Sequence, residues 1–225
     1  MAPGESPTAP AGTEPRKRRW VRTLLLVLVP LLILDAVIWW WLDRGNRLFF
    51  PRKWGVVVEG RLYRSGRIDA GLVEDALKDH AIAVVVDLAA GEPENADVRA
   101  EREAARRLGI RVVEVRGLEG DGTGDVAGYV TAVTEMARAA PGKAVLVHCT
   151  AGSERTGVAV ALYRMLVEGW DGVRAYDEYL GYRRHPPTDD HLVRFVNEHV
   201  ADVASRLAAA GVLGRVPSPL PSFGP

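Results

Sequence analysis

The chain has 225 residues, enough for one ordinary domain with additional segments. Its 29 Lys and Arg residues balance its 29 Asp and Glu residues, so composition gives no argument for nucleic acid as a partner. A single cysteine, Cys149, excludes an internal disulfide and argues against a cysteine-rich zinc site. We therefore expect neither a metal nor a cofactor.

The N-terminal region combines a polar tail with a long apolar run. Residues 1–19 are rich in Pro, Ala and Gly and end in a basic cluster, so we expect them to be disordered. Residues 20–42, WVRTLLLVLVPLLILDAVIWWWL, are long enough to cross a bilayer core of about 30 Å and carry tryptophans at both ends. A signal peptide would have a shorter apolar run and a small-residue cleavage site. A soluble helix would carry a polar face. We predict a single-pass transmembrane helix.

Basic residues on the two sides of this run give a weak orientation signal. Five lie at its N-terminal side and four follow it, and the first group is more tightly clustered. This favours a cytoplasmic N-terminus, with the rest of the chain outside the cytoplasmic membrane. Residues 43–55 are predicted to form a juxtamembrane linker, residues 56–210 a folded domain, and the Pro-rich residues 211–225 a disordered tail.

Strands and helices alternate along the predicted domain. The expected strands are two short ones within residues 56–66, around the turn Glu59-Gly60, and three more at 81–88, 110–115 and 143–147. The expected helices cover residues 70–79, 94–109, 126–140, 156–169, 171–183 and 188–211. This alternation predicts an α/β fold with a central, mostly parallel sheet flanked by helices. Functional groups in such sheets gather at the carboxyl ends of the strands.

The stretch VHCTAGSERTG, residues 147–157, follows the last predicted strand and contains the only cysteine. A lone cysteine is most often a small buried hydrophobe. Here it opens a loop of small residues that leads into a helix, where backbone N–H groups can converge on a phosphate. Arg155 adds a guanidinium that can bind two phosphoryl oxygens. The same donors would lower the pKa of a thiol and make Cys149 a nucleophile.

The sequence HCTAGSERTG resembles the signature loop of the cysteine-dependent protein tyrosine and dual-specificity phosphatases. The segments GRLYRSGRID, at 60–69, and VVVDL, at 84–88, resemble the compact atypical dual-specificity branch found in bacteria. The resemblance covers about residues 55 to 200. It implies a tyrosine-phosphatase-like fold for the domain and a phosphatase reaction through a phosphocysteine.

The resemblance also implies roles for the residues of the loop. Cys149 would attack phosphorus, Arg155 would bind the phosphoryl group, Thr156 would assist hydrolysis of the intermediate, and His148 would orient the loop and help ionise the thiol. The substrate phosphate would be bound by Thr150, Ala151, Gly152, Ser153, Glu154 and Arg155.

A general acid is expected on the glycine-rich loop at residues 117–125, a few tens of residues before the cysteine. Asp121 is the preferred candidate. Asp125 directly precedes a predicted helix and has an alternative explanation as its N-cap. Glu119 is a third candidate, and a Trp-Pro-Asp motif of the large tyrosine phosphatases is absent.

Three further residues have open interpretations. Arg64 either approaches the phosphate site or is solvated at the sheet end. Asp87 ends a strand and is interpreted as ordering a loop rather than as catalytic. Glu178 lies within a helix and is a candidate for a structural hydrogen bond.

Several functions remain in competition. The preferred one is a membrane-anchored phosphatase acting on phosphotyrosine or dual-specificity phosphoprotein substrates. The alternatives are a phosphatase for a phosphoinositide, inositol phosphate or other small phosphate ester, and a non-catalytic phosphate-binding module. Glu154 would repel a highly anionic substrate. A sulfurtransferase is disfavoured by the spacing to Arg155, and an arsenate reductase of this type by the lack of further cysteines. The oligomeric state is not indicated.

Overall fold

The computed structural model of the protein describes residues 16–43, 50–91, 93–183 and 191–225. The chain divides into two compact units, Met1–Asn46 and Arg47–Pro225.

The first unit contains one long helix. Helix α1, Arg16–Asp43, includes Pro30 and covers the predicted apolar run. Its segment Leu24–Trp41 has a mean hydropathy of 2.3 and no buried residue, and it is long and apolar enough to cross a membrane. Residues 16–19 are expected to be disordered, but the helix begins at Arg16 and includes this basic cluster. The rest of the predicted disordered tail, residues 1–15, lies outside the described residues.

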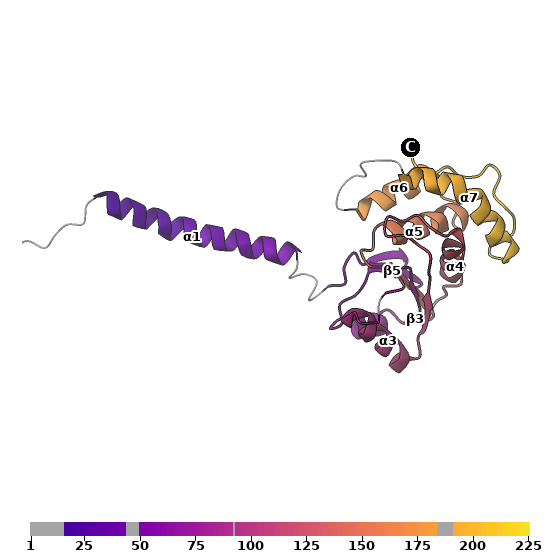
Figure 1. The fold of residues 1–225 in the computed structure, drawn as a ribbon, viewed down its shortest axis with the longest axis horizontal. Helices are drawn as coiled ribbons and strands as arrows, with labels where there is room; N and C mark the ends of the chain where they lie inside the picture. The colour runs from indigo at the N-terminus through magenta and orange to yellow at the C-terminus, as the bar shows by residue number, and fades with distance from the viewer. Residues whose placement is uncertain (1–15, 44–49, 92, 184–190) are drawn as a thin grey trace, which may run out of the picture. The chain divides into compact units, whose positions relative to one another are not determined.

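The second unit is an α/β domain built on a five-stranded sheet (Figure 1). The strands lie in the order β1-β2-β5-β3-β4, in which β1 is antiparallel to β2 and the other neighbours are parallel. This confirms the predicted fold class. The strands are β1 Gly55–Val58, β2 Leu62–Gly66, β3 Ile82–Asp87, β4 Arg111–Glu114 and β5 Ala144–Cys149. The helices are α2 Val73–Asp79, α3 Ala96–Leu108, α4 Val126–Ala137, α5 Glu154–Leu166, α6 Gly172–Gly181 and α7 His191–Ala209.

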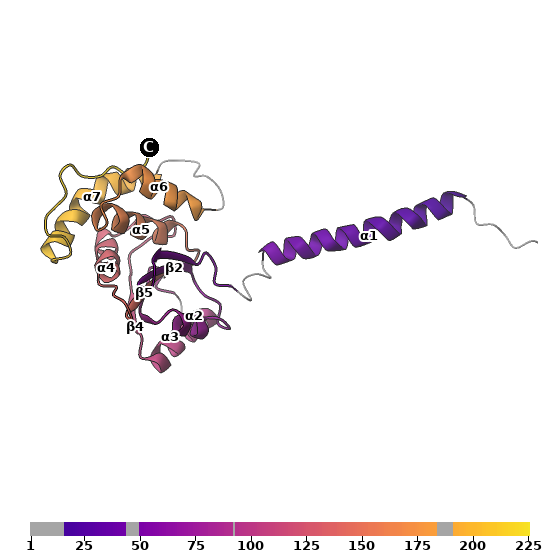
Figure 2. The same ribbon diagram turned by 180° about the vertical axis from the view of Figure 1, so that it is seen from behind.

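The helices form two layers, with α2 and α3 on one face of the sheet and α4 to α7 on the other (Figures 1 and 2). Side chains alternate between these faces along each buried strand. On β5, Leu146 packs with the α2 and α3 layer, whereas Val145 and Val147 join the larger core beneath α4, α5 and α7. The alternation continues to the end of the strand, so His148 and Cys149 project to opposite faces.

The predicted linker at 43–55 is wrong in its second half. Trp54 stacks on Tyr63, with ring centroids 5.3 Å apart, and on His80, at 4.4 Å. The carbonyl of Arg52 accepts a hydrogen bond from the N–H of Gly66 at 2.7 Å. Residues 51–54 therefore belong to the domain, because an aromatic anchor and a backbone bond hold them on β2.

The prediction that residues 211–225 form a disordered tail is also wrong. Phe223 is 1% exposed and packs edge-on against Tyr176 and Tyr179. The side-chain amide of Asn197 donates to the Phe223 carbonyl at 2.9 Å and accepts from its N–H at 2.8 Å. A single buried aromatic ring with both backbone groups satisfied thus fixes a segment whose Pro-rich composition suggested disorder.

Candidate active site

The carboxyl ends of the parallel strands meet at one edge of the sheet. Cys149 at the end of β5 is in register with Gly66 of β2, and His148 is in register with Asp87 of β3. Helix α5 begins at Glu154, so a short loop joins β5 to α5 at this edge. The structure therefore places the motif where a parallel α/β sheet has its binding site.

The loop curls tightly around the cysteine. Gly152 has a φ of +73°, and a side chain there would lie 2.5 Å from the N–H nitrogen of Gly66. Only glycine fits this position, because any Cβ would strike β2. The Gly152 N–H donates to Cys149 Sγ at 3.2 Å, so the loop backbone turns its donors inward, towards the thiol.

The environment of Cys149 favours its thiolate. The side chain is 2% exposed, and burial is the largest single influence, which would raise the pKa of the thiol. The hydroxyl and N–H of Thr156, the N–H of Gly152 and the charge of Arg155 together outweigh burial and lower the pKa of Cys149 below its ordinary value. A thiol with a depressed pKa at a helix N-terminus is a competent nucleophile.

Two arginines border the loop from different elements. Arg155, on the first turn of α5, donates to the Leu88 carbonyl at 3.3 Å and to Thr150 Oγ1 at 3.4 Å. Arg64, on β2, is fully buried, donates to the Gly152 carbonyl at 3.1 Å and stacks on the ring of Tyr182 at 3.6 Å. Arg64 is therefore not solvated at the sheet end, and it supports the phosphate loop through the Gly152 carbonyl.

His148 lies in a buried ion-pair cluster on the α3 face. Its Nε2 is 3.0 Å from Glu101 Oε2, and its Nδ1 is 3.9 Å from Asp87 Oδ1. Burial would lower the pKa of His148, but the charge and hydrogen bond of Glu101 and the charge of Asp87 outweigh it and raise that pKa to about 9. His148 is therefore protonated at neutral pH, one residue from the thiol.

The same cluster has the spacing of a metal site. Donor atoms of Asp87, Glu101 and His148 lie within 4.8 Å of one another. Asp87 also accepts hydrogen bonds from the N–H groups of Ala89 and Gly91, and it lies 3.7 Å from Arg67. The cations His148 and Arg67 balance the two carboxylates, so the cluster holds together as ion pairs. Asp87 orders the turn after β3, as its sequence position suggested.

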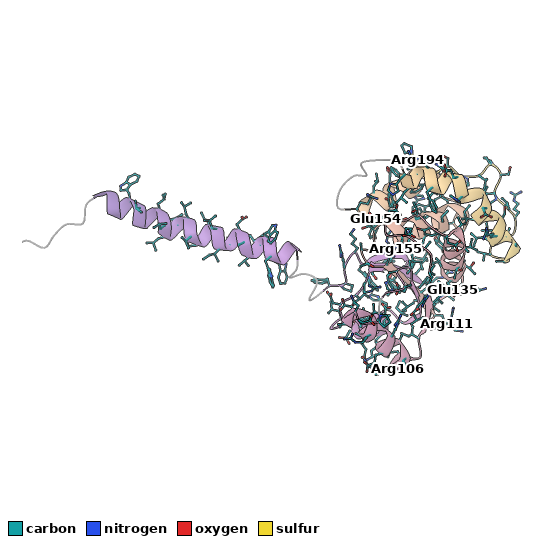
Figure 3. All side chains as sticks on the ribbon, viewed as in Figure 1. Arg106, Arg111, Glu135, Glu154, Arg155 and Arg194 are labelled. Atoms are coloured by element: carbon teal, nitrogen blue, oxygen red, sulfur yellow. The ribbon has the colours of Figure 1, made fainter. Side chains whose placement is uncertain are left out.

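The remaining residues of the predicted phosphate-binding loop contact neighbouring elements of the domain. The backbone of Ala151 lies 3.1 Å from where a Cβ on Gly66 would sit. Ser153 Oγ accepts from Lys53 Nζ, and Glu154 Oε1 pairs with Arg183 Nη1 at 3.3 Å. Glu154 lies beside Arg155 at the start of α5 (Figure 3). The structure thus brings the whole predicted loop together.

The glycine-rich loop approaches the phosphate loop through its apex. A side chain on Gly122 would lie 3.2 Å from Glu154 Cβ, and Asp121 directly precedes this point of contact. The Asp121 carboxylate accepts from the N–H of Thr123 at 2.9 Å and from its hydroxyl at 2.8 Å. These bonds lower the pKa of Asp121. Asp125 instead accepts from the Ala127 N–H at 2.8 Å and caps α4.

Glu119 and Glu178 have structural roles instead. The Glu119 backbone closes the glycine-rich loop by bonding to Thr123 and Gly122, which gives this residue a structural part. Glu178 pairs with Arg164 at 2.7 Å and has the structural role that was one interpretation of it.

Sequence reasoning missed two residues at this edge. Glu101 is 3% exposed within a charged helix, but it shares the buried face of α3 with Val98 and Ala105. That placement at i+3 and i+7 was a signal in the sequence. Lys53 was assigned to the linker, and nothing in its local sequence indicated that it reaches Ser153.

Comparison with known proteins relates the chain to a family and to several solved structures. The model of a family described as "Tyrosine phosphatase family" matches residues 51–212. The core catalytic domain of the PP-IP phosphatase SIW14 from S. cerevisiae superposes with a TM-score of 0.58 at 20% identity, covering 72% of this chain and 94% of that one. PTPMT1 in complex with PI(5)P gives 0.54 at 17% identity, covering 69% and 99%. TpbA from P. aeruginosa gives 0.49 at 27% identity, covering 68% and 88%.

No curated protein sequence matched the chain. The structural likenesses to SIW14 and PTPMT1 concern the fold, and the family match covers every strand and helix of the α/β domain from β1 to α7, including the cysteine loop. The chain belongs to the tyrosine phosphatase family and is a phosphatase.

Proposed function

We propose that the protein hydrolyses phosphate monoesters through a phosphocysteine formed on Cys149. The observation that carries the proposal is the buried thiol, whose pKa is lowered by donors of its own loop and by Arg155. The thiolate attacks phosphorus and the bond from phosphorus to the ester oxygen breaks. Arg155 and the N–H groups of residues 150–155 hold the phosphoryl oxygens during this transfer.

Asp121 is the proposed general acid. In the first step its carboxylic acid protonates the departing ester oxygen, and in the second its carboxylate takes a proton from the water that attacks the phosphocysteine. Inorganic phosphate leaves and the thiolate is restored. The close approach of the next residue, Gly122, to Glu154 supports this assignment, whereas the carboxylate of Asp125 accepts a hydrogen bond from the N–H of Ala127.

His148 and Thr156 act on the nucleophile. The protonated imidazole adds positive charge next to Cys149, and the Thr156 hydroxyl stabilises the thiolate when it is the leaving group of the second step. In this scheme the enzyme needs no metal, because Arg155 and the N–H groups of the loop offset the negative charge of the phosphoryl group.

Hydrolysis of 4-nitrophenyl phosphate by the full-length protein in detergent tests this function. We expect turnover that persists in EDTA and is abolished by Cys149→Ser. Turnover unchanged by that substitution would contradict the mechanism. Binding of phosphate without turnover in the wild type would support the non-catalytic alternative.

Among substrates, phosphotyrosine or a dual-specificity phosphoprotein is our first proposal. A phosphoinositide, inositol phosphate or other small phosphate ester is the second, and one observation favours it. Glu154, which would repel such substrates, is paired with Arg183, so much of its charge is offset at the loop. Release of phosphate from phosphopeptides and from inositol phosphates distinguishes the two.

We also propose that α1 anchors the enzyme in a membrane as a single pass, with the N-terminus in the cytoplasm. The apolar, unburied segment Leu24–Trp41 and the more tightly clustered basic residues before it support this. Retention in the membrane fraction after carbonate extraction tests the anchor. Protease added to intact cells tests the orientation, because the domain is cleaved only if it lies outside.

A further inference from the structure

Lys53 lies at the phosphate loop although its sequence position suggested a linker. It has a φ of +50°, a left-handed conformation that is uncommon for a residue other than glycine. On either side of it, the Arg52 carbonyl bonds to Gly66 and the Trp54 ring stacks on Tyr63. Strained backbone that is held from both sides is typical of functional positions. The structure thus fixes where the Lys53 side chain starts.

The ammonium group of Lys53 ends on the loop itself. Its Nζ donates to Ser153 Oγ, and Ser153 lies two residues before Arg155. An ammonium has three donors, of which this hydroxyl accepts one. Ser153 is neutral, so the contact does not neutralise the positive charge of Lys53, which is close enough to Cys149 to interact with its thiolate.

Electrostatics point the same way. Burial and the charge of Arg52 lower the pKa of Lys53, whereas Glu154 and the Cys149 thiolate raise it. Glu154 is itself paired with Arg183 at 3.3 Å. Among the described residues, Lys53 has lost solvation and gained little compensation, so an additional anion beside the loop would be attracted to its positive charge.

We propose that Lys53 is a substrate-binding residue that takes a second anionic group of the substrate, next to the scissile phosphate. The proposal rests on the phosphatase function above and selects within it. Because Lys53 contacts the loop that holds the first phosphate, the second anion must lie close to the first. A ring ester with phosphates on adjacent carbon atoms meets this condition. In a phosphotyrosine peptide, the aromatic ring holds the phosphate away from neighbouring carboxylates.

The test compares substrates that differ only in the spacing of two phosphates. We would measure kcat/KM of the full-length protein for myo-inositol 4,5-bisphosphate, whose phosphates are adjacent, and for myo-inositol 1,4-bisphosphate, whose phosphates lie opposite each other. The wild type is expected to prefer the adjacent isomer. Lys53→Met should reduce that preference about tenfold, the size of effect typical of one charged hydrogen bond. Lys53→Arg should restore most of it, since it keeps the charge.

Lys143→Met is the matched control, because this exposed lysine precedes β5 at the opposite edge of the sheet. It should leave the preference unchanged. A second arm presents the adjacent pair as phosphatidylinositol 4,5-bisphosphate and a non-adjacent pair as phosphatidylinositol 3,5-bisphosphate in phosphatidylcholine vesicles, so that a lipid source of the same chemistry is compared with a soluble one. A Lys53-dependent preference in either arm supports the proposal.

Three results would overturn it: no preference of the wild type in either arm, a preference that survives Lys53→Met, or an equal loss for both isomers. The last would mean that Lys53 only supports the loop. Hydrolysis of 4-nitrophenyl phosphate, run in parallel, separates these outcomes from failure of the phosphatase function, which would appear as activity that does not depend on Cys149.

Discussion

The phosphate loop and the glycine-rich loop meet at Gly122, yet they are held in different ways. In the phosphate loop, Cys149 and Thr156 are buried, and Thr156 and Gly152 donate hydrogen bonds to the sulfur of Cys149. In the second, the Asp121 carboxylate bonds to Thr123 of its own loop and stays near the surface. The nucleophile is therefore preorganised by the whole fold, whereas the acid is set by a few local bonds. Substitutions in the two loops should therefore affect catalysis in different ways.

The largest effect is expected on the preorganised side. Arg155→Lys keeps the charge but loses the planar fork that reaches both Leu88 and Thr150. We expect kcat for 4-nitrophenyl phosphate to fall about a thousandfold, because the transition state loses a bidentate partner. Arg106→Lys, at the C-terminal end of α3, is the control and should leave kcat unchanged. A loss of less than about tenfold would mean that Arg155 does not hold the transferring group.

On the acid side, Asp121→Ala should lower kcat about a hundredfold for an alkyl phosphate, whose leaving oxygen needs a proton. The loss should be much smaller for 4-nitrophenyl phosphate, whose leaving group departs unprotonated. Asp125→Ala should instead cost about 1 kcal/mol in the free energy of unfolding, through loss of the α4 cap, and leave the rate intact. If Asp125→Ala shows the leaving-group dependence, the assignment of the acid is wrong.

The buried cluster beneath the phosphate loop makes stability depend on pH. The pKa of His148 is about 9 in the folded state and 6.5 ordinarily. The contribution of protonated His148 to the free energy of unfolding is complete below pH 6.5 and is lost as pH rises through about 9, with a size on the order of 3 kcal/mol. Urea unfolding at several pH values should show this loss in the wild type.

Glu101→Gln removes the nearest counter-ion of His148 and should flatten that dependence between pH 6.5 and 9. Glu103→Gln is the control, because Glu103 lies on the same helix but pairs with exposed Arg107. An equal flattening by both substitutions would show that the cluster is not responsible.

The smallest effect is expected within the acid loop. Thr123→Val removes the side-chain hydrogen bond that helps to lower the pKa of Asp121, while the backbone bond from residue 123 remains. The pKa of Asp121 should rise, so the basic limb of the kcat/KM profile should move to higher pH by less than about one unit. Thr131→Val, on exposed α4 surface, should leave the profile in place. A shift to lower pH would contradict the proposed role.

The predictable parts of the site are those with local patterns. The spacing of Cys149 and Arg155, with a strand before and a helix after, was enough to place the phosphate loop, and the fold class followed from alternating elements. The insertion of β5 between β2 and β3 was not predictable from local periodicity, because strand partners are chosen by long-range packing.

The misses have the same physical origin. Phe223 and Trp54 anchor segments that composition had assigned to tail and linker, because one aromatic contact outweighs the average of its neighbours. Glu101 lay hidden among exposed charges of α3, and Lys53 reaches Ser153 across 100 positions of sequence. Each depends on a partner far away in the chain.

Trapping the intermediate tests the central claim most directly. The full-length protein is mixed with 4-nitrophenyl phosphate, quenched in acid during turnover, digested and analysed by mass spectrometry. Because Cys149 is the only cysteine, any phosphocysteine is assigned without ambiguity. The account predicts one phosphoryl group on the peptide containing Cys149, and none after Cys149→Ser. Continued turnover with an unmodified Cys149 peptide, or turnover by Cys149→Ser, would contradict it.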